Sequence, residues 1–235
     1  MGLPNLGYRA YAEMIPELTR FGKPVIASIA GLCEDDFLTM ARVINQARPD
    51  LIEVNLSCPN IPGKPQIAYD PVDSERLLKR VRPLITVPMG VKLPPYFDPA
   101  HHAVMADVIR RCGVDYLNLI NSVGNGLVVD AKRETPVIKP KGGFGGLGGS
   151  LIKPVALANV RAFWKLLEGR IPIIGTGGVV QGVDAFEHVL CGASAVQVGT
   201  ALVEEGVGVF ERLERELAAE LAMRGKQSLE ECRGK

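Results

Sequence analysis

The sequence predicts an α/β protein of the TIM (β/α)8 barrel class, and three observations lead to that prediction. Short apolar segments rich in β-branched residues alternate with segments of helical periodicity along the 235 residues, which indicates a parallel sheet. The apolar segments are continuous, as in strands that are covered by helices on one side and packed inside a barrel on the other. Polar residues and glycines follow several segments, where barrel enzymes hold their active sites.

The pattern predicts six strands in chain order. Their ranges are 25–30, 51–56, 89–93, 116–120, 171–175 and 195–198. Helical periodicity fills most of the gaps between these strands. The predicted helices cover 35–46, 73–81, 102–112, 154–167 and 183–191, with a last helix from about 207 to 224.

The last two predicted strands end in similar sequences, Gly175-Thr176-Gly177-Gly178 and Gly199-Thr200-Ala201. Many barrels build a phosphate site after strands seven and eight, from backbone N–H groups and helix N-termini. The predicted strands would then be strands three to eight of the barrel. Because closure needs eight strands and a βαβ unit takes roughly 30 residues, we expect strands one and two to be absent from this chain, in front of Met1. The residues before Val25 would form the second loop and helix.

Residues from about 123 to 153 interrupt the alternation of strand and helix. A charged stretch, Asp130 to Glu134, is followed by residues 142–149, of which six are glycine. We interpret this segment as an excursion inserted over the active-site face of a single (β/α) barrel domain that spans residues 1–235. Within the excursion, Asn125-Gly126 predicts a tight turn.

The composition excludes several classes of protein. The chain is 47% hydrophobic and 23% charged, with a net charge of +1 and its basic residues spread out, so neither a nucleic-acid stripe nor a polybasic membrane patch is predicted. No apolar run approaches the roughly 18 to 20 residues of a membrane span, and the N-terminus lacks the pattern of a leader peptide. We expect a cytoplasmic protein that binds neither nucleic acid nor membrane. The five cysteines show no C-x-x-C spacing, so no metal site is predicted.

The segment Asn55-Leu56-Ser57-Cys58-Pro59-Asn60 sets a cysteine between two asparagines at the carboxyl end of a predicted strand. Acyl transfer by a thiol requires a histidine base beside it, and this segment contains none. A cysteine flanked by neutral amides is better suited to removing a proton from a hydrogen-bonded heterocycle. The segment therefore predicts proton abstraction by Cys58.

Three further motifs lie at predicted strand ends. They are Gly90-Val91-Lys92-Leu93-Pro94-Pro95-Tyr96, Asn121-Ser122-Val123-Gly124-Asn125-Gly126 and Lys139-Pro140-Lys141-Gly142-Gly143-Phe144-Gly145-Gly146. Together with the cysteine segment, extended by Ile61-Pro62-Gly63-Lys64-Pro65-Gln66, they resemble the dihydroorotate dehydrogenase family in its soluble, fumarate-using class 1A. The resemblance covers essentially the whole chain. Cysteine in place of serine argues against the quinone-using class, and the segments 62–66 and 92–95 argue against the class with an iron–sulfur subunit.

The resemblance implies FMN-dependent oxidation of (S)-dihydroorotate to orotate in de novo pyrimidine biosynthesis. Fumarate, reduced to succinate, would be the electron acceptor, and the enzyme would be a homodimer. Cys58 would remove a proton from C5 while a hydride leaves C6 for N5 of FMN. Lys92 would lie beside the pyrimidine ring of the flavin, where a fixed cation stabilises the anionic reduced form.

The resemblance also implies binding roles. Asn55, Asn60, Asn121 and Ser122 would bind the pyrimidine ring of the substrate, because an amide offers both donor and acceptor, and Asn55 would also contact the flavin. The other implied flavin contacts are Ile120, Gly149, Gly177, Gly178, Gly199 and Thr200. The end of a substrate-contacting loop would comprise Met1, Gly2 and Leu3. Residues 59–65 would act as a lid that excludes water, and Lys141 matches a family lysine without an assigned role.

The sequence departs from the family at its front. Full-length members carry two further strands with a flavin-contacting lysine, and a substrate-binding asparagine just before the position of Met1. Two alternatives follow. One is a related flavin barrel such as the pyrimidine-reducing domain of dihydropyrimidine dehydrogenase, which uses a similar Asn-x-Ser-Cys-Pro segment on substrates that lack the carboxylate. The other is a non-catalytic truncated barrel that acts only as an interaction module.

Overall fold

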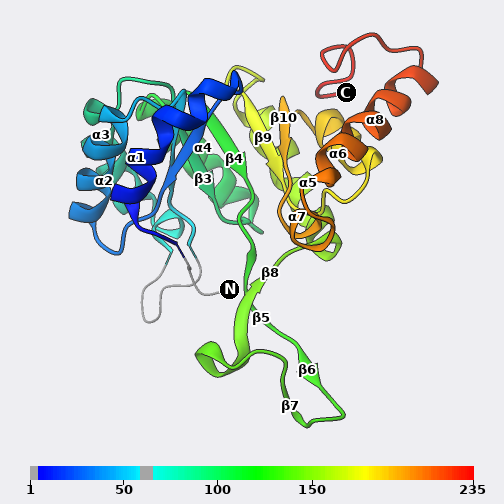
Figure 1. Cartoon of the computed structure of the whole chain (residues 1–235), viewed down its shortest axis with the longest axis horizontal. Coiled ribbons are helices and arrows are strands. Elements are labelled where there is room, and N and C mark those ends of the chain that lie inside the picture. Colours follow the sequence, from blue (N-terminus) through cyan, green and yellow to red (C-terminus); the bar gives the residue numbers. More distant parts are fainter. Residues whose placement is uncertain (1–4, 59–65) are drawn as a thin grey trace.

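A curled parallel sheet organises the chain (Figure 1). The structure is a computed structural model that describes residues 5–58 and 66–235. Within these ranges the main sheet has six strands in the order β1-β2-β3-β4-β9-β10. They are β1 (Ile26–Ile29), β2 (Leu51–Asn55), β3 (Met89–Leu93), β4 (Tyr116–Leu119), β9 (Ile173–Thr176) and β10 (Ala195–Gln197). Every neighbouring pair is parallel, so the carboxyl ends of the strands lie along one edge of the sheet.

The strand predictions are confirmed to within two residues at each end. The largest difference is at β9, which was predicted to begin at Ile171 and begins at Ile173. Pro172 explains it, because proline has no N–H to donate to a neighbouring strand, and its carbonyl instead accepts from Leu117 N at 2.9 Å. Closure into a barrel of eight strands is not observed in the described ranges, where β1 and β10 form the two edges of the sheet.

Helices cover the outer face of the sheet (Figure 1). They are α1 (Tyr8–Leu18), α2 (Glu34–Gln46), α3 (Pro71–Val81), α4 (Pro99–Arg111), α5 (Lys153–Leu166), α6 (Gly182–Cys191), α7 (Thr200–Glu205) and α8 (Gly208–Met223). The last one, α8, packs on α6 instead of on the sheet itself. Two helices begin with an aspartate followed by proline: Asp70 caps α3 and Asp98 caps α4 through their side-chain oxygens. Aspartate satisfies free N–H groups there, and proline fits the first helical position. Among the helices that the structure describes, none has the length and apolar character to cross a membrane.

The two faces of the sheet differ in chemistry, which the sequence analysis did not predict. Ile52, Val54, Val91, Leu117 and Leu119 are buried in the core between sheet and helices. The residues between them face the opposite side, because side chains alternate along a strand. That inner face carries polar groups, including Glu53, Asn55, Lys92, Asn118 and Gln197. The strands were predicted to be continuously apolar; they instead alternate, and the inner polar groups satisfy one another by hydrogen bonds.

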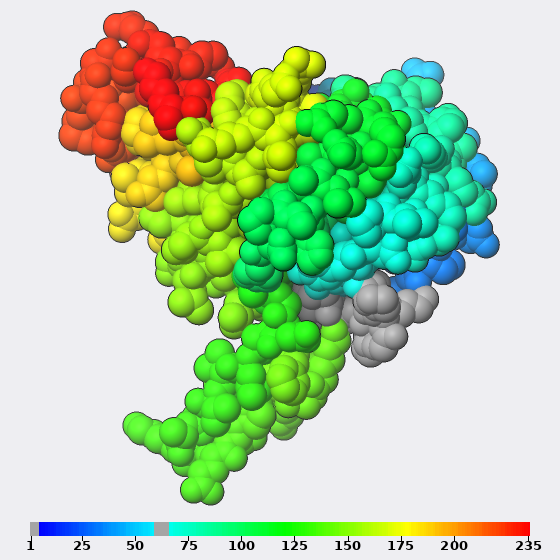
Figure 2. Space-filling view, turned by 180° about the vertical axis from the view of Figure 1, so that it is seen from behind, coloured from blue at the N-terminus to red at the C-terminus, as the bar shows by residue number. Residues whose placement is uncertain are grey.

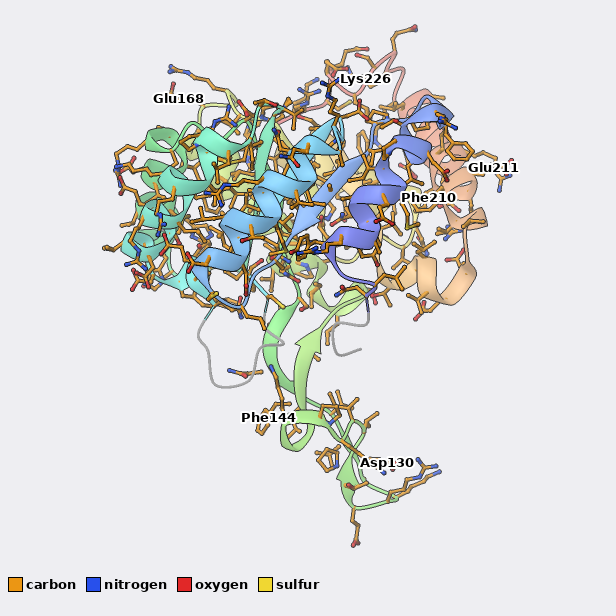
Figure 3. All side chains as sticks on the ribbon, turned by 60° about the vertical axis from the view of Figure 1, so that its left-hand side comes forward. Asp130, Phe144, Glu168, Phe210, Glu211 and Lys226 are labelled. Atoms are coloured by element: carbon orange, nitrogen blue, oxygen red, sulfur yellow. The ribbon has the colours of Figure 1, made fainter. Side chains whose placement is uncertain are left out.

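The excursion predicted at 123–153 forms an arm that projects away from the body (Figures 1 and 2). Its stem pairs β5 (Val123–Leu127) with β8 (Phe144–Leu147), and its tip pairs β6 (Val129–Asp130) with β7 (Thr135–Pro136), both antiparallel. Figure 3 labels Phe144 on the stem and Asp130 at the tip. The arm leaves the sheet at the carboxyl end of β4 and returns at Gly149, so it starts at the expected face but extends outward from it.

The tight turn predicted at Asn125-Gly126 was wrong. Asn125 lies inside β5 with a left-handed φ of 56°, and the pairing of β5 with β8 shifts register between Val123 and Gly126. Asparagine tolerates this conformation, which serves a β-bulge as well as a turn. The dipeptide therefore bends a strand instead of reversing the chain.

Five predicted features lie outside the described residues. They are the substrate-loop residues Met1, Gly2 and Leu3, the pyrimidine-binding Asn60, and the lid at 59–65.

Gly90 provides a test of the packing on the inner face. It lies on β3 opposite Tyr116, and a methyl group at Gly90 would lie 2.0 Å from the Tyr116 ring. We expect Gly90→Ala to lower the free energy of unfolding by about 1–3 kcal/mol, since overpacking forces the ring or the backbone to move. Chemical denaturation followed by circular dichroism measures this loss.

The matched control for this prediction is Gly208→Ala at the start of α8, where an added methyl group meets nothing within 4 Å. Alanine favours helix over glycine, so the control should retain or slightly gain stability. Equal stability of the two variants would contradict the packing that we describe.

Candidate functional site

The carboxyl ends of β3, β4, β9 and β10 surround one cleft. Its lining contains nine of the residues proposed from the sequence: Lys92, Ile120, Asn121, Ser122, Gly149, Gly177, Gly178, Gly199 and Thr200. They come from segments separated by more than a hundred residues along the chain. Parallel pairing brings them together, because each strand delivers its following loop to the same edge.

Glycine is required where the loop after β9 turns past α5. Gly177 and Gly178 have φ of 122° and 75°, a region that other residues rarely adopt. A methyl group on Gly178 would also lie 2.4 Å from the Cβ of Lys153. At Gly199 an added Cβ would meet nothing within 4 Å, so the cleft is open on that side.

Asp184 anchors this glycine loop. Its Oδ2 accepts from the N–H groups of Val180 at 2.9 Å and Gln181 at 2.7 Å, and its Oδ1 accepts from Lys153 Nζ at 2.6 Å. Burial by itself would raise the pKa of Asp184, but the hydrogen bonds from Lys153 and the two N–H groups hold that pKa below its ordinary value. Asp184 thus ties the first turn of α6 to the start of α5.

A second polar cluster forms where β2 and β4 end. Asn121 Nδ2 donates to the Ser57 carbonyl at 3.0 Å, to Ser57 Oγ at 3.1 Å and to Asn55 Oδ1 at 3.3 Å. Ser57 in turn donates from its N and its Oγ to Asn55 Oδ1, both at 3.0 Å. Asn55 and Asn121, two of the three asparagines proposed for the pyrimidine ring, are therefore held against each other. Ser122 continues the cluster, since its N–H donates to Asn121 Oδ1 at 2.8 Å.

Ser57 holds this cluster in place, and the sequence analysis did not single it out. It is fully buried, and its Oγ lies 3.1 Å from the Lys92 carbonyl, which is an alternative acceptor to Asn55 Oδ1 for the single hydroxyl proton. The sequence did carry a signal for Ser57: it lies between two apolar residues at a strand end, and a hydroxyl that is buried there requires a hydrogen-bond partner.

Cys58 follows Ser57 and is half-buried. It borders a different hollow from the cleft, an apolar groove beside β1 that Ser28 and Ala30 also line. The thiol therefore lies on the β1 side of the asparagine cluster, whereas the glycine loops lie on the β9 and β10 side. Lys141 is placed elsewhere, on the arm, with a left-handed φ of 53°.

Lys92 extends from β3 toward the far edge of the sheet. Its Nζ donates to Gln197 Oε1 at 2.9 Å. Burial lowers the pKa of Lys92 below its ordinary value, and the negative charge of Glu53 opposes that fall. Gln197 was not among the predicted site residues, although a polar residue in the short apolar strand β10 was a signal for it.

Comparison with known proteins bears on the whole chain. The family model described as dihydroorotate dehydrogenase matches residues 1–221. "Dihydroorotate dehydrogenase A (fumarate)" of Lactococcus lactis is 48% identical over 239 residues, which cover 100% of this chain and 77% of the relative. "Dihydroorotate dehydrogenase (fumarate)" of the yeast Kluyveromyces lactis is 50% identical, over 100% of this chain and 76% of the relative.

The ion pair between Asp184 and Lys153 predicts a pH-dependent stability. Asp184→Asn should lower the free energy of unfolding at pH 7 by about 1–3 kcal/mol, because Lys153 keeps only Glu187 as a carboxylate partner and the N–H groups of Val180 and Gln181 lose a charged acceptor. Since the pKa of Asp184 is lowered on folding, the carboxylate stabilises the fold above its unfolded pKa, and this stabilisation is lost as the pH falls below about 4. Denaturation curves at pH 7 and pH 3 measure both effects.

The control for this prediction is Asp107→Asn, which removes an exposed partner of Arg110. It should change stability by less than about 0.5 kcal/mol at either pH. An Asp184→Asn variant whose deficit is the same at pH 3 and pH 7 would contradict the role given to the charge.

Proposed function

This chain belongs to the dihydroorotate dehydrogenase family, and from that membership we propose that it oxidises (S)-dihydroorotate to orotate, with FMN as the flavin and fumarate as the electron acceptor. The observation that carries the proposal is the match over the full chain to relatives with that name. The cleft at the carboxyl ends of the strands supports it, because nine of the residues implied by the resemblance line that cleft. The step would belong to de novo pyrimidine biosynthesis.

The residues of the cleft fit an FMN group. Positive φ at Gly149, Gly177 and Gly178 lets backbone N–H groups approach an anion without side chains in between. The open space at Gly199, before the first turn at Thr200, leaves room for a phosphate. Bound FMN would accept the hydride from C6 of the substrate. Lys92 would place its ammonium at the flavin pyrimidine edge and favour the negative charge that develops there, and Ile120 would pack against the ring.

The asparagine cluster fits the pyrimidine substrate. Ser57 holds Asn55 and Asn121, and Asn121 in turn accepts from the Ser122 N–H. The cluster offers both donors and acceptors, as an imide ring requires for recognition. Asn60, Met1, Gly2 and Leu3 would complete the contacts, and the segment 59–65 would exclude water. Cys58 would take the proton from C5 as the general base.

The proposed architecture is a (β/α)8 barrel in which β1 to β4, β9 and β10 occupy the positions of strands three to eight, within a single domain of residues 1–235. The parallel order and the outer helices support this arrangement. We propose a cytoplasmic location for the enzyme.

The arm supports the proposal of a homodimer. Several large apolar side chains are exposed on it: Leu127, Val128, Val129, Val137, Ile138 and Phe144. Exposed apolar side chains that gather on one segment are typical of an interaction site, and a two-stranded ribbon is only marginally stable without a surface to pack on. A second copy of this chain would cover the arm.

The function is tested by the absorption spectrum of the purified chain, supplied with FMN under anaerobic conditions. Dihydroorotate should bleach the band of bound flavin, and fumarate should restore it. Dihydrouracil, which lacks the carboxylate, is the control substrate and should bleach the band far more slowly. Binding of flavin without bleaching by dihydroorotate would refute the proposed reaction, and faster bleaching by dihydrouracil would favour the related pyrimidine-reducing enzyme.

The proposed base predicts a specific kinetic defect. Cys58→Ala should bind FMN normally and slow flavin reduction by about 10² to 10⁴-fold, the usual contribution of general-base catalysis. Stopped-flow absorbance measures the rate. Cys33→Ala removes an exposed thiol and should reduce flavin at the wild-type rate. Undiminished reduction in Cys58→Ala would remove Cys58 from the mechanism.

The proposed dimer predicts an effect of charge on the arm. Val137→Lys, at a side chain that is 60% exposed, should weaken self-association because burying an unpaired ammonium in an apolar interface is unfavourable. Sedimentation velocity should show the wild type as a dimer and the variant shifted to monomer. Val72→Lys on α3, where the side chain is 74% exposed, should leave the dimer intact. A dimer unaffected by Val137→Lys would place the interface elsewhere.

A further inference from the structure

Each strand of the sheet contributes one polar side chain to a network on the inner face. The members are Ser28 from β1, Glu53 from β2, Lys92 from β3, Asn118 from β4, Thr176 from β9 and Gln197 from β10. Lys92, Thr176 and Gln197 also line the proposed flavin cleft. The network therefore connects the buried centre of the sheet to the cleft.

The network leads from a carboxylate to an ammonium. Glu53 Oε1 accepts from Ser28 Oγ at 2.8 Å, and Glu53 Oε2 accepts from Asn118 Nδ2 at 2.6 Å. Asn118 Nδ2 also donates to Gln197 Oε1 at 3.1 Å, and the same oxygen accepts from Lys92 Nζ at 2.9 Å. Two amides thus separate the negative charge of Glu53 from the positive charge of Lys92.

The orientation of both amides depends on the carboxylate. A carboxylate only accepts hydrogen bonds, so Asn118 must turn its NH2 group toward Glu53. Its Oδ1 then accepts from Thr176 Oγ1 at 2.5 Å, and its NH2 group fixes the oxygen of Gln197 toward the interior. Gln197 consequently presents that oxygen to Lys92. A neutral amide at position 53 could donate as well as accept, and Asn118 could then face it in either orientation.

Burial makes the two charges interdependent. Glu53 is 3% exposed and Asn118 is fully buried, so an unpaired charge at position 53 would be costly. Burial lowers the pKa of Lys92, and Glu53 opposes that fall. Among the residues that the structure describes, the other titratable group with a pKa that responds to Glu53 is Tyr116, and both burial and Glu53 raise this pKa, so Tyr116 remains neutral. Ser28, Asn118, Thr176 and Gln197 carry no charge.

We propose that Glu53 is a positioning residue, which acts through the amides of Asn118 and Gln197 to orient the Lys92 ammonium toward the flavin cleft. The negative charge of Glu53 also favours the protonated form of Lys92. Its importance for catalysis rests on the proposed function, in which Lys92 adjoins the flavin. Its effect on Lys92 does not depend on that function, because it follows from groups of this chain alone.

The test measures the titration of Lys92 in the flavin-free protein. The rate of acetylation of Lys92 at a series of pH values, determined by mass spectrometry of its peptide, gives the pH at which half of the amine is protonated. In Glu53→Gln this midpoint should fall by about one pH unit, because a neighbouring opposite charge shifts a pKa by about that much or more. Glu53→Asp, which keeps the charge, should restore most of the shift.

The matched control is Glu75→Gln, which removes a carboxylate from the outer helix α3, where it pairs with Arg111. The Lys92 midpoint should remain at the wild-type value in this variant. A folded Glu53→Gln whose Lys92 midpoint also equals the wild-type value would overturn the proposal.

A second variant keeps the test decisive if Glu53→Gln does not fold. Gln197→Met, at an exposed position on the edge strand, removes the amide that connects Asn118 to Lys92 but keeps the charge of Glu53. The Lys92 midpoint should therefore fall by less than in Glu53→Gln. An unchanged Lys92 midpoint in Gln197→Met would overturn the proposal that Glu53 acts through the Gln197 amide. Where both variants fold, the midpoint shift in the double variant should be smaller than the sum of the two single shifts, because both changes interrupt the same chain of hydrogen bonds. A double variant with the full sum would also overturn the proposed connection.

The outcomes separate this proposal from the proposed function. A shifted Lys92 midpoint in a chain that oxidises no dihydroorotate would support the role of Glu53 and refute the reaction. An active wild type together with an unshifted Lys92 midpoint in Glu53→Gln would support the reaction and refute the role of Glu53. In an active enzyme, flavin binding by Glu53→Gln should persist, while the alkaline limit of flavin reduction moves to lower pH together with the Lys92 midpoint.

Discussion

Parallel pairing of neighbouring strands is the constraint on which the rest of this structure depends. It requires a helical connection between most successive strands, which supplies the outer layer, and it brings the loops that follow the strands to one edge. The glycine loop after β9, the asparagine after β4 and the lysine of β3 meet only for that reason. Antiparallel pairing occurs in the arm, which leaves the body and takes no part in the main sheet.

The inner face of the sheet shows how a buried surface can carry charge. Glu53 and Lys92 lie on neighbouring strands, yet amides and hydroxyls from the other strands connect them. Each polar group in this network has a partner that suits its donors or acceptors, which a low-dielectric interior requires. The outer face has no such requirement and is closely packed with aliphatic residues. The charged side chains of the network thus lie on one side of the sheet, whereas the other side packs against the helices.

Two solutions to anchoring a loop occur side by side. The loop after β9 depends on glycines with positive φ and on the aspartate that binds its N–H groups. The segment after β2 depends on a buried serine that binds the asparagines of two strands. The first lines the cleft with glycines that carry no side chain, which suits the approach of an anion to the backbone, whereas the second presents amide side chains and suits a ring with donors and acceptors.

The sequence by itself determined the order of strands and helices, the projecting segment and most residues of the cleft, because periodicity, capping and strand-end motifs are local properties of the chain. Only the tertiary structure decided that Asn125 bends a strand, that the arm extends outward, and that Glu53 is connected to Lys92. Those features depend on register and on the curl of the sheet, and the hydrogen bonds of the inner network join residues separated by 21 to 105 positions. A polar residue within a strand signals a buried partner, but the partner is chosen by the geometry that brings distant strands together.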